Sequence, residues 1–150
     1  MRWLRALAVW LAIVVAETLH GIARTLWLTP IVGDHAARQI GVGTGSLLIF
    51  VITWLAIRWI GLVGRRELLA AGALWVVLML AFEIVLGRTV MGFGWDRIGA
   101  EFDPRRGGLL LFGHLALLLM PLLTARLRGV DGAVTGSPGR ENDAQSSSPG

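Results

Sequence analysis

Four long apolar stretches restrict this chain to a narrow set of folds. They cover about residues 6–28, 40–60, 68–86 and 108–125, and each is rich in Leu, Val, Ile and Ala on every helical face. The first is expected to end ahead of Pro30. A helix needs about 20 mainly apolar residues to cross a bilayer, and a helix that is apolar all round does not lie flat on a membrane surface. The pattern predicts an all-α fold, an integral membrane bundle of four transmembrane helices.

The remaining composition sets the domain limits and excludes several classes of function. Charged residues form only 16% of the chain and gather in islands between the apolar stretches, so we expect one transmembrane domain over residues 1–128. Residues 129–150 are mostly small and polar, which predicts a disordered cytoplasmic tail because such a segment buries too little apolar surface. The chain has no cysteine, which excludes thiolate metal sites. The net charge of +4 comes without a basic stripe interleaved with aromatic residues, so we expect no nucleic-acid partner.

The distribution of arginine predicts the orientation, because basic residues favour the cytoplasmic side of a membrane. With the N-terminus inside, the arginines on the cytoplasmic side are Arg2, Arg5, Arg58, Arg65, Arg66, Arg126, Arg128 and Arg140. Those on the outer side are Arg24, Arg38, Arg88, Arg97, Arg105 and Arg106. The difference favours both termini in the cytoplasm.

Four ionisable residues fall inside the predicted spans: Glu17, His20, Glu83 and His114. At about 1.5 Å of rise per residue they all lie in the outer half of the membrane at similar depths. Charged groups at such depths are costly, face the interior of a bundle and often mark ion or proton pathways. The predicted site is therefore a Glu/His layer to which three helices contribute.

This layer has three open interpretations. In the first it is structural, with Arg24 and Arg88 as the charge partners of the two glutamates, within one half or crosswise between the halves. His20 and His114 are then neutral histidines that form a hydrogen bond with a carboxylate. In the second it carries ions or protons. In the third it binds a metal, because the Glu17-x-x-His20 spacing puts both groups on one helical face and the same four residues offer carboxylate and imidazole ligands. Haem with two histidine ligands is a further version of the third, although the pattern favours no cofactor.

Small residues and an internal similarity bear on how the helices pack. Ala8, Ala12 and Ala16 form one small-residue row, and Gly41 and Gly45 form another, so we expect close helix contacts at both. The two halves of the chain share an acid, a following arginine and an Asp with Arg-x-Gly. Duplication of a helical hairpin and chance similarity both explain this.

Several short motifs resemble a group of small bacterial four-helix integral membrane proteins. They are ETLHGIAR at residues 17–24, GD at 33–34, RQI at 38–40, TGS at 44–46, FE at 82–83, GR at 87–88 and WDR at 95–97. The resemblance spans roughly residues 10–115. It implies a bacterial origin, hence a cytoplasmic (inner) membrane location, and no particular activity.

Three classes of function follow from the residues. The favoured one is a transporter or ion-translocating protein that uses the Glu/His layer, with a homodimer expected because one short chain holds an incomplete pathway. The second is a non-catalytic accessory or envelope-maintenance protein with a membrane protein partner. The third is a metal- or haem-binding redox protein. Enzymatic activity is not favoured, because no serine is placed as a nucleophile.

Overall fold

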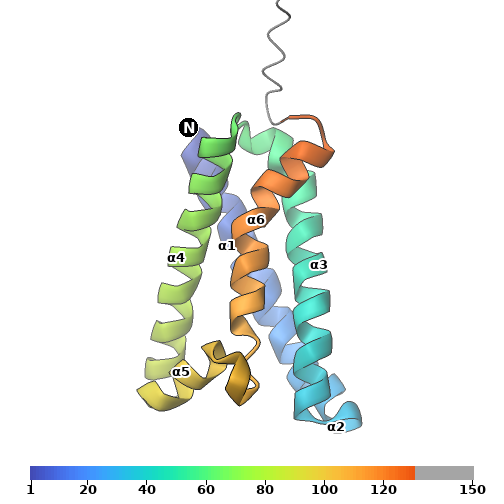
Figure 1. Cartoon of the computed structure of the whole chain (residues 1–150), viewed down its shortest axis with the longest axis vertical. Helices are drawn as coiled ribbons and strands as arrows, with labels where there is room; N and C mark the ends of the chain where they lie inside the picture. The colour runs from blue at the N-terminus through green and yellow to red at the C-terminus, as the bar shows by residue number, and fades with distance from the viewer. Residues whose placement is uncertain (131–150) are drawn as a thin grey trace, which may run out of the picture.

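The computed structural model describes residues 1–130, and all the regular secondary structure in them is helical. Four helices are long and apolar enough to cross a membrane: the continuous helical run Arg2–Val32, then Asp34–Ile60, Arg65–Thr89 and Leu110–Leu127. The chain is a multi-pass membrane protein, and the four spans within its described residues are arranged as a helical bundle (Figure 1). The predicted fold class is confirmed. The predicted tail lies outside the described residues from position 131 onward.

The first span is longer than predicted because proline does not end it. Helix α1 (Arg2–Ala23) leads into the π-helical segment η1 (Arg24–Leu28) and then into the short helix α2 (Thr29–Val32), which contains Pro30. Proline has no N–H and its ring crowds the carbonyl four residues earlier, and a local π turn accommodates this. The predicted end at Leu28 was therefore too early.

The second span also begins earlier than predicted. Gly33, with φ of 83°, makes the turn after α2, and helix α3 (Asp34–Ile60) starts immediately after it. Residues 34–39, which include Asp34 and Arg38, are therefore helical and form the start of α3, ahead of the apolar stretch. Helix α4 (Arg65–Thr89) follows after a tight turn over residues 61–64.

The connection between the third and fourth spans contains two short helical elements. Helix α5 (Trp95–Phe102) and the 3-10 turn η2 (Pro104–Arg106) precede helix α6 (Leu110–Leu127). The Asp103 carboxylate accepts a hydrogen bond from the backbone N–H of Arg105 and starts that turn. The bundle thus has an N-terminal end and an opposite end, the α5 end, where α2 and α5 lie (Figure 1).

Helix α1 crosses the bundle diagonally. Near the N-terminal end the Trp75 indole of α4 donates a hydrogen bond to the Ala6 carbonyl of α1, at 3.0 Å. Toward the α5 end α1 lies against α3 instead, and α6 lies between α3 and α4 (Figure 1). The diagonal path brings residues of all four spans around the space at the α5 end.

The apolar core occupies the half of the bundle near the N-terminal end. Its buried members are Ala6, Val9, Ile13, Val14, Ile49, Ile57, Ile60, Leu62, Leu68, Ala71, Trp75, Met79, Leu117, Leu122 and Ala125. Gly72 of α4 lies so close to the Leu118 carbonyl of α6 that a Cβ would collide with it. The predicted alanine contact row is wrong, because Ala8 and Ala12 are exposed on the outer face of α1.

Candidate functional site

A cavity of about 240 Å³ lies in the half of the bundle near the α5 end, and all four spans line it. The structure places all four members of the predicted Glu/His layer on its wall: Glu17, His20, Glu83 and His114. Arg24, Arg38 and Glu101 line it as well. Ionisable groups from α1, α3, α4, α5 and α6 thus converge on one membrane-embedded space.

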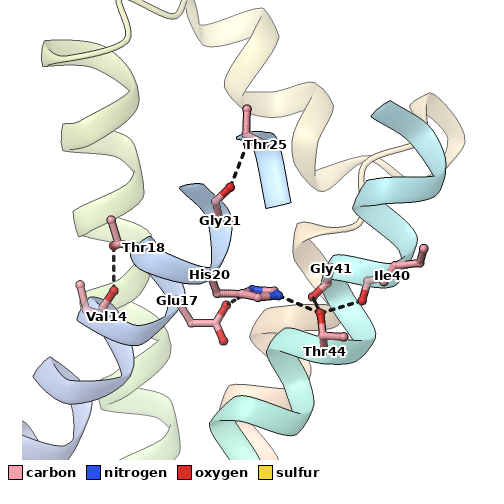
Figure 2. A network of polar contacts seen from close by, with 9 residues as sticks. All are labelled: Val14, Glu17, Thr18, His20, Gly21, Thr25, Ile40, Gly41 and Thr44. Carbon is pink, nitrogen blue, oxygen red and sulfur yellow. Dashed lines mark hydrogen bonds and ion pairs between the residues drawn. The ribbon is translucent and has the colours of Figure 1, made fainter. Parts of the chain in front are cut away.

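The first acid–imidazole pair lies within one helix. The His20 Nδ1 atom is 3.7 Å from a Glu17 carboxylate oxygen, one turn along α1. The other ring nitrogen, Nε2, is 2.8 Å from the Thr44 hydroxyl of α3, and Figure 2 shows the ring directed at Thr44. Thr44 also lies 2.9 Å from the Ile40 carbonyl. Because the hydroxyl can donate either to that carbonyl or to the ring, the His20 tautomer is not determined by its partners.

The second pair joins two helices and has a determined tautomer. The His114 Nδ1 atom lies 2.8 Å from the Leu110 carbonyl. A carbonyl oxygen only accepts, so Nδ1 carries a hydrogen and donates it. The other ring nitrogen, Nε2, faces a Glu83 carboxylate oxygen of α4 at 3.3 Å. The His114 side chain is 8% exposed and Glu83 28% exposed, so this pair is better shielded on its imidazole side.

Two glycines of α3 provide the space in which the α1 side chains lie. A Cβ on Gly45 would come within 2.9 Å of a Glu17 carboxylate oxygen, and a Cβ on Gly41 would come within 2.5 Å of Arg24 Cδ. Gly43, on another face, has nothing within 4 Å of its Cβ position. The predicted close approach at Gly41 and Gly45 is present, but it accommodates polar side chains and not a helix backbone.

The predicted arginine partners of the two glutamates need correction. Among the described residues the ion pairs of Glu17 and Glu83 are with His20 and His114. Arg88 instead donates a hydrogen bond to the Phe93 carbonyl and stacks on Trp95 at 4.9 Å. The i to i+5 spacing from Glu83 to Arg88 points the two side chains in different directions on α4, which explains the difference.

Three polar atoms on the cavity wall have no hydrogen-bond partner in the part of the chain that the structure describes. They are Glu17 Oε1, Glu83 Oε2 and His114 Nε2. The last two face each other at 3.3 Å, but their relative orientation is not that of a hydrogen bond. Buried polar atoms without partners are uncommon and call for a ligand, water or proton.

The metal interpretation has less support. Within residues 1–130, no three Asp, Glu or His side chains are grouped closely enough to hold a metal ion. The wall offers two separate acid–imidazole pairs, one from Glu17 and His20 and one from Glu83 and His114. Two pairs suit proton exchange better than a single multidentate metal site.

One ion pair at this site was missed by the sequence analysis. The Arg38 guanidinium of α3 lies 2.6 Å from the Glu101 carboxylate of α5, and its Nε lies 2.9 Å from Asp34. Arg38 and Glu101 line the main cavity and also a second, outer pocket beyond it, which Asp34 and Arg106 help to form. The ion pair therefore stands between the two spaces. A sequence signal for it was weak, because Glu101 lies 63 residues from Arg38.

Comparison with protein-family models, with curated proteins and with solved structures gave no match to this chain. The geometry of the cavity is therefore the basis for assigning a function.

Proposed function

We propose that this membrane protein is a small transporter or ion-translocating protein that binds protons in its membrane-embedded cavity. One observation carries the proposal. His114 donates from Nδ1 to the Leu110 carbonyl, and its Nε2 faces the Glu83 carboxylate. With no proton between them, two acceptors would face each other in a low-dielectric site, which is unfavourable.

We therefore assign one shared proton to the Glu83–His114 pair. It either sits on the ring, giving an imidazolium beside a carboxylate, or on the carboxyl group, which then donates to a neutral ring. In both forms the two heavy atoms, Glu83 Oε2 and His114 Nε2, are 3.3 Å apart. The Glu17–His20 pair, at 3.7 Å on the same wall, is a second exchange partner. Chains of Glu and His inside membranes are typical of proton relays.

Access to the cavity is asymmetric. On the α5 side the Arg38–Glu101 ion pair lines both the cavity and the outer pocket. Toward the N-terminal end the packed core, with Trp75 fully buried, closes it. Movement across the membrane then requires a second conformation in which the apolar half opens, as in alternating access, and a homodimer interface is one way to provide it.

We place the protein in a bacterial inner membrane with both termini in the cytoplasm. The excess of arginine at the N-terminal end and the resemblance to small bacterial membrane proteins support this. The α5 end then faces outward, and the outer pocket becomes the entrance.

Proton flux into proteoliposomes tests the proposal. The full chain is reconstituted with a trapped pH-sensitive dye, and flux is driven by a valinomycin-clamped potassium gradient. Glu83→Gln should reduce flux to that of empty liposomes, because the amide can donate to His114 Nε2 but carries no exchangeable acid proton. Glu67→Gln is the matched control, since Glu67 lies on the same helix at the N-terminal end and pairs with Arg2. A folded wild-type protein without flux would favour the accessory-protein class instead.

A further inference from the structure

Arg24 is the starting point for a ligand site in the main cavity. Its side chain lies on the wall, at the junction between α1 and the π-helical segment η1. The aliphatic stem lies against Gly41 of α3, where a Cβ would come within 2.5 Å of Arg24 Cδ. The absence of a side chain at position 41 is therefore what allows the stem to lie there.

The other charged groups of the cavity have partners of opposite charge or proton-sharing partners. Arg38 pairs with Glu101 and Asp34. Glu17 and Glu83 each face a histidine. Among the described residues, Arg24 is the cavity arginine that forms no ion pair and no side-chain hydrogen bond. Arg24 lies toward the α5 end of the first span, Arg2–Val32, and a guanidinium on a span is costly without a counter-ion.

We propose that Arg24 binds the oxyanion of a small organic carboxylate that enters this cavity. This inference rests on the part of the proposed function that makes the cavity a binding site, and it does not depend on proton flux. The guanidinium presents a planar fork of N–H donors that matches a carboxylate bidentately. The remaining wall is largely apolar, with Ile49, Met79, Leu110 and Leu117. A short apolar chain on the ligand would contact these side chains.

Cavity size and charge restrict the ligand further. The volume of about 240 Å³ is below the range of roughly 300–1,000 Å³ usual for drug-sized ligands, so the ligand has few heavy atoms. An anion at Arg24 adds negative charge to a wall that already carries Glu17 and Glu83. The positive charge of the Arg24 guanidinium compensates for the charge of the anion.

Thermal unfolding of the full chain in a neutral maltoside detergent tests the inference. The unfolding midpoint is titrated with sodium butyrate at constant ionic strength, and with butyramide as the uncharged isostere. Butyrate should raise the midpoint saturably and butyramide should not. Arg24→Gln should weaken the apparent affinity about tenfold or more, because a charged hydrogen bond is lost. Arg65→Gln, at the other end of the bundle, should keep the wild-type affinity.

Three results would overturn the inference: no saturable shift in the wild type, an equal shift with butyramide, or an unchanged affinity in Arg24→Gln. Should Arg24→Gln not fold, Arg24→Lys replaces it. Lysine keeps the charge but loses the fork, so a several-fold weaker affinity is expected and an unchanged one contradicts the inference.

A lipid phosphate offers the same oxyanion chemistry, and a separate arm distinguishes it. Dihexanoyl phosphatidylglycerol replaces butyrate in the same titration. A shift that depends on Arg24 with this lipid, and none with butyrate, would assign Arg24 to a headgroup and overturn the carboxylate site. Proton flux measured without butyrate is independent of these outcomes, so failure of anion binding and failure of the proposed function can be told apart.

Discussion

The two halves of this bundle are built from the same four helices but differ in what lies between those helices. Near the N-terminal end the helices pack through aliphatic side chains around the fully buried Trp75. Near the α5 end the same helices separate around a cavity of about 240 Å³ and present charged groups to it. Each helix contributes one part to each half, so the division runs across the bundle and not along the chain.

The difference is clearest at the glycines. In the apolar half Gly72 brings the backbones of α4 and α6 together, and its neighbour is the Leu118 carbonyl. In the cavity half Gly45 leaves space for the carboxylate of Glu17. Helices in lipid gain little from the hydrophobic effect and associate through close packing. We therefore infer that the apolar half determines stability, and that the cavity half uses that stability to hold polar groups in the membrane.

The largest expected effect is in the apolar half. Gly72→Ala should lower the free energy of unfolding by about 3 kcal/mol or more, because the new methyl group collides with a backbone carbonyl and the two helices must separate. The measurement is the unfolding midpoint in detergent. Gly113→Ala in α6 is the control, since nothing lies within 4 Å of its Cβ position, and alanine there should be neutral or stabilising. Equal midpoints for the two variants would show that the tight contact does not determine stability.

The sequence predicted the features that depend on local composition and helical period. Four spans follow from apolar length, and the convergence of Glu17, His20, Glu83 and His114 on one cavity agrees with the depth calculated from helical rise. These quantities need only the residues of one helix and its direction through the membrane.

The features that the sequence did not predict depend on contacts between distant segments. Pro30 suggested the end of a helix, and only the π turn at Arg24–Leu28 allows the helix to continue. The short amphipathic helix α5 brings Glu101 to Arg38, which no local pattern indicates. The sequence offered both arginines and histidines as partners of the glutamates, and the pairing of Glu83 with His114 depends on contact between two spans.

A smaller effect is expected at the entrance to the cavity. Because the chain has no cysteine, Gly113→Cys introduces a single thiol on the cavity wall, where its Cβ position is unobstructed. Adding Glu101→Gln to this variant should raise about fivefold the rate at which a membrane-impermeant methanethiosulfonate labels the thiol. The reason is that a partly exposed ion pair contributes about 1 kcal/mol.

The control for this labelling is a second acid of α5. Asp96→Asn changes a carboxylate that is not on the cavity wall, so the labelling rate of the introduced thiol should stay that of the single-cysteine protein. Equal rates in Glu101→Gln and Asp96→Asn would mean that the Arg38–Glu101 pair does not control access. Labelling of intact proteoliposomes from one side only also reports which end of the bundle faces outward.

The last expected effect compares two glycines that lie two positions apart on α3. Gly45→Ala should be about 1 kcal/mol less stable than Gly43→Ala, because both gain the same helix propensity but only the first forces the Glu17 carboxylate to move from 2.9 Å contact. The two unfolding free energies are measured in the same detergent, and then again in a Glu17→Ala background. Removing the carboxylate should abolish the difference, since the double-mutant cycle isolates that single contact. A difference that persists in Glu17→Ala would show that position 45 is restricted by the helix backbone, and the cavity half would then be packed by the same rule as the apolar half.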